Sequence, residues 1–238
     1  MMDAELNPGV TIGRIKASPT EDTLHRLRAA IEDGRLPPGV RLPEEKLARA
    51  LSSSRARVRE VLALLANERL VDQQANRGAF VARPTVEEAR HICEARLMAE
   101  RIMARLAAER ATPHDLKIMS DLLRKERVAW DSGDVRTAVF MSRNFHRAIA
   151  DAAANPVLAD MLSSLLSRSA LTQAVYAARG AAGCLCDDHC ALLAAIAAGD
   201  ADRAETEMAE HMQNMINRLD LEPLSQDVDI EDALRNTI

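Results

Sequence analysis

The 238-residue sequence has very few aromatic residues, with one Trp, one Tyr and three Phe. Strands favour aromatic and β-branched residues, whereas the Ala, Leu and Met that are abundant here pack well between helices. The composition therefore argues against an all-β protein, and the chain is long enough for one large domain or two ordinary ones. The sequence also lacks a long apolar run: the longest has eight residues, Ala191 to Ala198, whereas a membrane span needs about 20.

A hydrophobic leader is absent as well, because acids stand at Asp3 and Glu5 near the N-terminus. We therefore expect a cytoplasmic protein, in which the four cysteines stay reduced. Three of them cluster with a histidine in the segment Cys184-Leu-Cys186-Asp-Asp-His189-Cys190. Thiolates and imidazole are common zinc ligands, but the single-residue spacing of the first pair fits no common zinc finger. Reduced thiols are the favoured interpretation, with a zinc knuckle and redox sensing as alternatives.

The charge is divided unevenly along the chain. Residues 1–83 hold 14 Lys and Arg against 11 Asp and Glu, the remainder holds 17 against 25, and the net charge is −5. A basic N-terminal third on an acidic body suggests that the first third contacts a polyanion. The overall acidity does not exclude DNA binding, because local charge sets the attraction to phosphates.

The first third of the sequence predicts a flexible arm over residues 1–17 and three helices after it. These helices run over about 20–33, 44–51 and 55–69, and hydroxyls of Ser52-Ser53-Ser54 can cap the third. Two extended segments, 70–74 and 79–81, follow, and the turn Ala75-Asn76-Arg77-Gly78 joins them. Gly78 is free to take a positive φ there. Three helices and a hairpin predict a winged helix-turn-helix over residues 18–83.

Everything after Pro84 looks helical, and the sequence predicts helices over 86–110, 113–131, 134–153, 156–178, 185–198 and 200–220. Six helices with short links form an antiparallel bundle. The expected fold class is therefore mainly α, with the N-terminal winged helix-turn-helix followed by an all-helical domain over residues 84–222. The acidic, weakly patterned residues 223–238 are predicted to form a mobile tail.

Arginines gather at the start of the third helix, where Arg55, Arg57 and Arg59 can reach guanine edges or phosphates. The opposite, packed face follows the 3.6-residue period and consists of Val58, Val61, Leu62 and Leu65. The helix N-terminus offers donors to a phosphate, and Arg77 at the hairpin tip is placed to enter a minor groove. The alternative, a merely solubilising helix face, is disfavoured by the helix-turn-helix spacing and by the wing that follows.

The sequence resembles the GntR family of bacterial transcription regulators, with a FadR-type ligand-sensing (FCD) domain in its helical part. The resemblance covers nearly the whole chain and is carried by Gly34-Arg35-Leu36-Pro37-Pro38-Gly39, Arg41-Leu42-Pro43-Glu44, Ser54-Arg55, Val58-Arg59-Glu60 and Asn76-Arg77-Gly78-Ala79-Phe80-Val81. It implies base and phosphate contacts by Arg55 and Arg59, a phosphate contact by Ser54, and a wing contact by Gly78. Six bundle helices would indicate the VanR-like branch of the group.

Two departures from the family pattern affect DNA recognition. Ala56-Arg57 replaces the Thr-Pro that many members carry between the two arginines, and Glu45 stands where some relatives have a DNA-contacting arginine. The operator sequence therefore does not follow from that of a relative.

Three histidines of the helical part, His146, His189 and His211, are candidate metal ligands. By themselves they favour surface or satisfied core histidines over ligands. The resemblance changes this interpretation, because FadR-type domains often bind a divalent metal through three histidines in these places and an Asp. Ser142 stands where that Asp would be, at the i,i+4 spacing from His146. We therefore expect Zn²⁺ or Ni²⁺ on three imidazoles, with weakened affinity.

The pattern Glu94-Ala-Arg96 with Glu100 matches the family's Glu-x-Arg-x-x-x-Glu motif. An inward-pointing guanidinium needs an anion and suits a carboxylate. We expect a small organic acid as effector, bound by Arg96, Glu100 and Ser142 together with the metal or its histidines. The alternative is an internal salt bridge between Arg96 and Glu100 at i,i+4.

The predicted function is a homodimeric, ligand-responsive transcription regulator and not an enzyme. Repression is the favoured mode, and each wing domain would bind half of a pseudo-palindromic DNA operator. Effector binding would rearrange the bundle and the linker at Pro84. The alternatives are a metal-responsive regulator and a helical metalloenzyme fused to a DNA-binding domain, which lacks a clearly placed general base.

Overall fold

The computed structural model describes residues 18–178 and 186–221. The predicted N-terminal arm and C-terminal tail lie outside these ranges. The N-terminal part contains three helices, α1 (Pro19–Glu32), α2 (Glu44–Ala50) and α3 (Arg55–Asn67), followed by strands β1 (Val71–Gln74) and β2 (Gly78–Val81). The strands pair antiparallel, with Val71 opposite Val81 and Gln74 opposite Gly78. The predicted winged helix-turn-helix is therefore confirmed.

Local signals explain where these elements begin and end. Ser18 and Glu21 form a capping box at the start of α1, and the Ser54 hydroxyl accepts a hydrogen bond from the Arg57 amide at the start of α3. In the hairpin turn Gly78 adopts a φ of +95°, the conformation that its lack of a Cβ permits. The segment before α2 lies along the other edge of β2, where the Leu42 amide donates to the Ala79 carbonyl at 2.8 Å.

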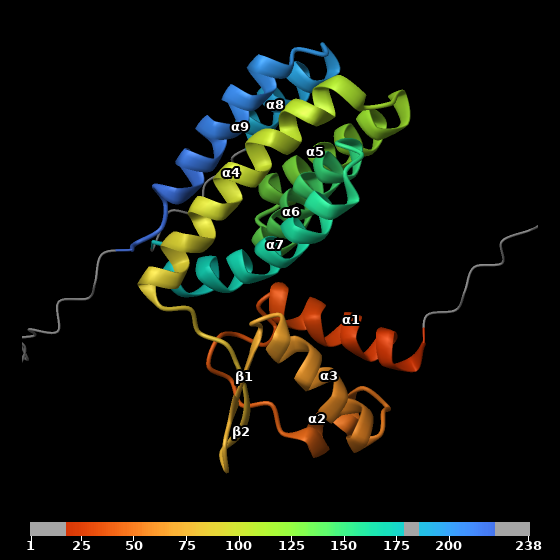
Figure 1. The fold of residues 1–238 in the computed structure, drawn as a ribbon, viewed down its shortest axis with the longest axis vertical. Helices are drawn as coiled ribbons and strands as arrows, with labels where there is room; N and C mark the ends of the chain where they lie inside the picture. Colours follow the sequence, from red (N-terminus) through yellow and green to blue (C-terminus); the bar gives the residue numbers. More distant parts are fainter. Residues whose placement is uncertain (1–17, 179–185, 222–238) are drawn as a thin grey trace, which may run out of the picture.

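The rest of the described chain forms the predicted helical bundle (Figure 1). Its helices are α4 (Val86–Arg110), α5 (Pro113–Asp131), α6 (Val135–Ala152), α7 (Pro156–Tyr176), α8 (Cys186–Ala197) and α9 (Ala201–Ile216). Helix α4 contacts α6, α7, α8 and α9, so it lies along the centre of the bundle. The described residues include no helix that is long and apolar enough to cross a membrane.

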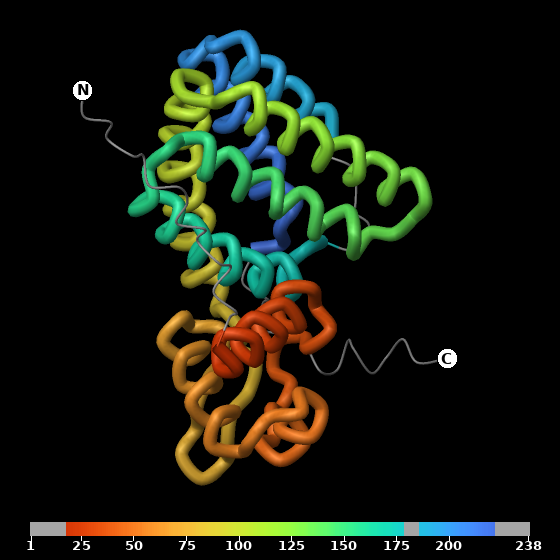
Figure 2. Tube along the Cα trace, turned by 90° about the vertical axis from the view of Figure 1, so that its right-hand side faces the viewer, coloured from red at the N-terminus to blue at the C-terminus, as the bar shows by residue number. Residues whose placement is uncertain are grey.

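The two parts meet through α1 and α7 (Figure 2). Leu171 of α7 belongs to the hydrophobic core of the winged domain, a cluster that includes residues of α1 and α3. The Tyr176 hydroxyl, at the end of the same helix, donates to the Pro84 carbonyl in the linker at 2.8 Å. Helix α7 therefore holds both the winged domain and the chain that leads out of it.

The cysteines differ from the expectation in one respect. Cys93 and Cys190 are free thiols, whereas Cys186 is disulfide-bonded, so the prediction that all cysteines stay reduced is wrong for Cys186. Cys184 lies outside the described residues. Burial raises the pKa of the Cys93 thiol, which makes it a poor nucleophile.

Candidate functional site

Two of the four arginines predicted to contact DNA lie along one groove of the winged domain, whereas Arg57 and Arg77 do not line it. Arg55 and Arg59 of α3 line this groove together with Gln73, Gln74 and Gly78 of the hairpin. The folded chain therefore brings the start of α3 and the wing to the same face. Arg77, at the hairpin tip, lies over the Phe80 ring at 5.9 Å from its centroid.

The arginines of α3 differ in how they are held. Arg59 pairs with Glu44 through two hydrogen bonds of 3.0 and 2.8 Å, and these bonds lower the pKa of Glu44 and raise that of Arg59. Arg57 is partly buried and reaches back to the Ser53 hydroxyl at 3.5 Å. Arg55 is exposed at the first position of the helix. Ser54 therefore caps the start of α3 and Glu44 holds Arg59, while Arg55 lines the groove.

Sequence reasoning did not assign a role to Arg41, which lines the same groove. A Cβ built on Gly78 would lie 3.9 Å from the Arg41 guanidinium, so the two residues are close neighbours. The signal was present in the Arg41-Leu42-Pro43-Glu44 motif, but only the pairing of Arg41 with Phe80 of β2 shows that it adjoins the wing.

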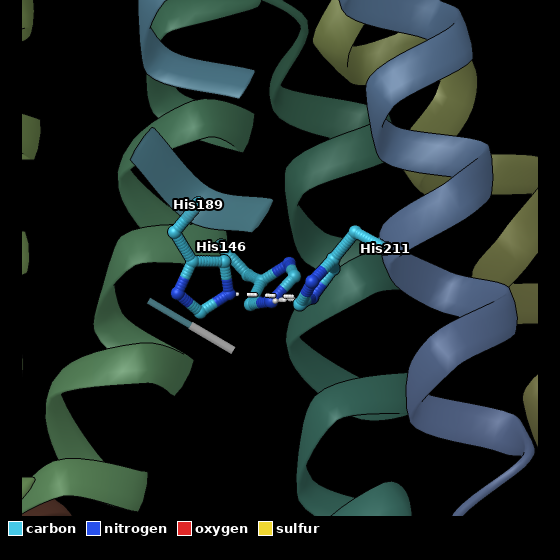
Figure 3. Close-up of side chains that lie close together, drawn as sticks. All are labelled: His146, His189 and His211. Carbon is cyan, nitrogen blue, oxygen red and sulfur yellow. Dashed lines mark hydrogen bonds between the residues drawn. The ribbon is translucent and has the colours of Figure 1, made fainter. Parts of the chain in front are cut away.

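The three histidines meet in the centre of the bundle, on α6, α8 and α9 (Figure 3). His211 Nε2 lies 3.2 Å from His189 Nε2 and 3.3 Å from His146 Nε2. One ligand atom from each lies within 4.8 Å of the others, and all three side chains are buried. The structure thus brings together residues that are 65 positions apart at most.

A carboxylate stands behind each imidazole. Glu100 contacts Nδ1 of His146, Glu126 lies 2.9 Å from Nδ1 of His189, and Asp188 lies 3.6 Å from Nδ1 of His211, an electrostatic contact. When Nδ1 donates its proton to such a carboxylate, Nε2 keeps a lone pair and is the metal-binding atom. Nδ1 of His146 and Nδ1 of His189 each have such a partner, whereas Nδ1 of His211 has no hydrogen-bond partner among the described residues. The three Nε2 atoms converge on one place, and three imidazole nitrogens are a donor set that fits a divalent metal ion.

The pKa shifts of four groups in this cluster, His146, His211, Glu100 and Asp188, indicate which of them are charged. Burial lowers the pKa of His146 and brings that of His211 to about 3. Burial opposes the ionisation of Glu100, but the charge of Arg96 and the hydrogen bond to His146 outweigh it and lower the pKa of Glu100 to about 2. The nearby His211 lowers the pKa of Asp188 to about 2. At neutral pH His146 and His211 are therefore neutral and Glu100 and Asp188 are charged, as metal binding requires.

Arg96 forms the internal salt bridge that the sequence offered as the alternative. Its Nε lies 2.7 Å from Glu100 Oε1 and its Nη1 lies 2.8 Å from the Ser169 hydroxyl. Glu100 therefore holds both Arg96 and His146. Arg96 still lines a cavity, together with Ser142 and His146, whereas Glu100 is not among the residues that line it.

This cavity has a volume of about 470 Å³, a size suited to a small organic ligand. Its apolar walls come mainly from Trp130, Val139, Phe140, Leu166 and Met215. It also reaches the winged domain, because Glu32, Asp33 and Gly34 line it as well. One cavity therefore touches the histidine cluster and the end of α1.

Four residues of this region were not anticipated from the sequence: Glu32, Glu126, Arg143 and Asp188. Glu126 and Asp188 carry no motif that separates them from surface acids, and only the approach of α5 and α8 to the histidines identifies them. Glu32 and Arg143 meet across the domain boundary, at a sequence separation of 111 residues.

Comparison with known proteins matches both parts of the chain. Residues 91–214 match the FCD domain family, and residues 19–81 match the family described as bacterial regulatory proteins, gntR family. The chain is 32% identical over 225 residues to the putative L-lactate dehydrogenase operon regulatory protein of Escherichia coli, covering 81% of this chain and 83% of that protein. It is 29% identical over 185 residues to the galactonate operon transcriptional repressor of Escherichia coli, covering 66% and 75%.

Among solved structures, the fold is similar to that of E. coli McbR/YncC, with a TM-score of 0.76 and 27% identity. The similarity covers 84% of this chain and 96% of that one, so it includes the winged domain and the bundle together.

Proposed function

Because this chain belongs to the GntR family of bacterial regulatory proteins and carries an FCD domain, it is a ligand-responsive DNA-binding transcription regulator, and we propose that it is a repressor controlled by a small organic acid. The acid binds in the bundle cavity beside a divalent metal ion held by His146, His189 and His211. The observation that carries this proposal is the set of three buried Nε2 atoms, each with a carboxylate behind its ring. A repressor is supported by the name of the galactonate relative.

On the DNA side, Arg55 reads a base edge, and Arg59 and Ser54 bind phosphates at the start of α3. The exposure of Arg55 and its place beside Gly78 in one groove support this assignment. The further proposed contacts are Arg57 and Arg77, the second entering the minor groove. Because DNA is its target, the proposed place of action is the cytoplasm.

The proposed assembly is a homodimer on a pseudo-palindromic operator. It is supported by exposed apolar side chains at i,i+4 spacing on two helices that contact each other. Met98 and Ile102 of α4 are 72% and 46% exposed, and Val157 and Met161 of α7 are 69% and 54% exposed. Exposed apolar side chains in such numbers are typical of an interface, and a two-fold contact would orient two winged domains for two half-sites. Light scattering of the purified chain should give twice the protomer mass.

On the ligand side, Zn²⁺ or Ni²⁺ would supply a Lewis-acidic position to which an effector carboxylate can bind. Ser142 lines the cavity without offering the charge of an Asp, and Arg96 lines it near the same histidines. The names of two relatives refer to an L-lactate dehydrogenase operon and a galactonate operon, and they support a small organic acid as the effector.

The first experiment measures metal by elemental analysis of untagged protein and DNA binding by gel shift on the chain's own upstream region. We expect one zinc or nickel ion per chain and a sequence-preferring shift at moderate salt. Absence of metal after soaking would refute the metal assignment. Absence of a specific shift would refute the proposal that the chain binds an operator in its own upstream region.

A second candidate is a regulator whose signal is the metal itself, which the buried histidine cluster also favours. Gel shifts with Zn²⁺ alone distinguish the two candidates. A metal sensor changes its DNA affinity on adding Zn²⁺, whereas the proposed acid-responsive repressor keeps the same affinity until an acid is added.

A further inference from the structure

A buried group of ion pairs joins the two domains at the wall of the cavity. Glu32, the last residue of α1, accepts a hydrogen bond from Arg147 at 3.1 Å and another from the Ser167 hydroxyl. Arg143 donates to the Glu32 main-chain carbonyl at 3.0 Å and to Asp33 Oδ1 at 2.8 Å. Each contact runs from the winged domain to α6 or α7. The end of α1 is therefore held to the bundle by charge.

Arg143 is buried, and one of its donor nitrogens lacks a hydrogen-bond acceptor among the described residues. Its side chain is 6% exposed, and its Nε lies 3.4 Å from Glu32 Oε2 without a hydrogen-bond partner among the described residues. A buried donor without an acceptor is costly, so a further acceptor at this guanidinium would be favourable. Because Arg143 already contacts the carboxylates of Asp33 and Glu32, a further carboxylate is the kind of acceptor that it would bind.

Arg143 and the histidine cluster share the cavity. Arg143 stands three residues before His146 on α6, about 4.5 Å along the helix axis, and both line the cavity with Glu32 and Asp33. The cavity thus has the histidines at one place and, one helical turn away, an arginine that binds the carboxylates of the winged domain. An acid with two carboxylates can contact both places at once.

The end of α1 depends on these arginines. Its last turn carries Glu32 and no basic residue, and Asp33 follows as the C-cap. Acids at a helix C-terminus are unfavourable because they face the negative end of the helix dipole, so Arg143 and Arg147 supply the compensating charge. Helix α1 is in turn joined to the end of α3 by Arg28, which binds Glu68 at 2.9 and 2.6 Å.

We propose that Arg143 is a second anion-binding subsite and that the effector is a dicarboxylate, with one carboxylate at the histidine cluster and the other at Arg143. The second carboxylate takes the place of Asp33 and Glu32 on Arg143, and α1 is released from the bundle. This inference rests on the proposed function, which places the first carboxylate at the metal. A ligand shifts the domain arrangement only as far as it prefers one state.

Competition between Glu32 and the ligand for Arg143 would have a consequence that a purely structural ion pair would not have. If Glu32 and the ligand compete for Arg143, removing the charge of Glu32 must tighten ligand binding, because the coupling is reciprocal. The test uses the full-length, zinc-loaded protein and the quenching of Trp130, the single tryptophan, which lines the cavity. The ligands are glutarate and adipate, with butyrate as the monocarboxylate comparison.

We expect glutarate or adipate to bind the unaltered protein more tightly than butyrate. Glu32→Gln should tighten dicarboxylate binding about tenfold, which corresponds to about 1.4 kcal/mol, and leave butyrate unchanged. Arg143→Gln should reduce the dicarboxylates to the affinity of butyrate. Asp22→Asn, an exposed acid on the same helix, is the matched control and should change neither.

Arg143→Gln leaves buried carboxylates without a partner, so the double variant Glu32→Gln with Arg143→Gln replaces it if the single variant does not fold. The double variant should bind dicarboxylates no better than butyrate. Equal dicarboxylate affinity of the unaltered protein and Glu32→Gln overturns the proposal, and so does a panel in which no dicarboxylate binds better than butyrate. Metal content and ligand-free DNA binding are measured on the same samples, and they separate this failure from a failure of the proposed function.

Discussion

The DNA-facing groove and the interior of the bundle hold their charged side chains in opposite ways. In the groove, Arg59 is 67% exposed and pairs with Glu44, which is 30% exposed. In the bundle, Glu100, Glu126 and the histidines in front of them are almost entirely buried. An exposed ion pair contributes little to stability and is easily exchanged, whereas a buried one is held in a single geometry and is costly to break.

This contrast suits two different tasks. A regulator must approach and leave DNA, and an exposed arginine can replace a carboxylate by a phosphate with little loss. A metal site gains from ligands that are already oriented, and the carboxylates of Glu100 and Glu126 orient the rings of His146 and His189. The effects of substitutions on the two sides should therefore differ in size, and substitutions in the groove should leave the metal content unchanged.

The largest effect should come from His211, the histidine whose Nε2 contacts both of the others. His211→Ala removes one of three protein ligands, so the bound metal should fall from one ion per chain to none by elemental analysis. His114→Ala, an exposed histidine of α5, should keep its metal. A variant that lost His211 and retained stoichiometric metal would show that the ion binds elsewhere.

A smaller loss is expected from Glu126, which contacts Nδ1 of His189 and is not one of the three proposed ligands. Glu126→Gln keeps the shape of the side chain but weakens its hold on Nδ1, and metal affinity should fall about 10- to 100-fold. Competition with a chromophoric chelator measures this change. Glu109→Gln, at an exposed position of α4, serves as the control, and equal affinities in both variants would contradict the role given to Glu126.

On the other side of the molecule, Arg55→Ala should weaken specific DNA binding by about 1–3 kcal/mol, because a bidentate base contact has that value. The metal content should stay the same. Gel shifts on specific and scrambled duplexes measure the effect, with Arg124→Ala on the bundle surface as control. Equal loss on both duplexes would mean that Arg55 binds a phosphate instead of a base.

The smallest effect, and one of opposite sign, is expected at Glu44. Glu44→Gln removes the carboxylate that competes with a phosphate for Arg59, so DNA should bind roughly two- to fivefold more tightly at the same salt concentration. Weaker binding would instead show that Glu44 supports DNA binding by positioning Arg59.

Local sequence signals were sufficient for most of the fold. The helices α4 and α5 begin and end at the predicted residues, because Thr85 and Thr112 form capping boxes and Pro113 starts the second of them. The wing was predictable for the same reason, since Gly78 at its turn needs a positive φ. The third helix was predicted to end two residues later than α3 does, at a terminus without a proline or glycine.

The candidate site was only partly predictable. The metal-ligand role of His146, His189 and His211 was predicted from a family resemblance, because the residues alone favoured surface or satisfied core histidines. Nothing local distinguishes Glu126 from other acids of an amphipathic helix, and it became a partner of His189 only when α5 met α8. Arg96 illustrates the converse, because its i,i+4 spacing to Glu100 allowed a salt bridge that the structure then contained.

The sequence by itself determined the order of the helices, the winged domain and the exposed arginines of α3, because capping, turn chemistry and helical periodicity act within a few residues. Only the tertiary structure decided which carboxylate stands behind each histidine and that Arg143 of the bundle holds the end of α1. These pairings join residues up to 111 positions apart, and they depend on how the helices pack, which no local pattern records.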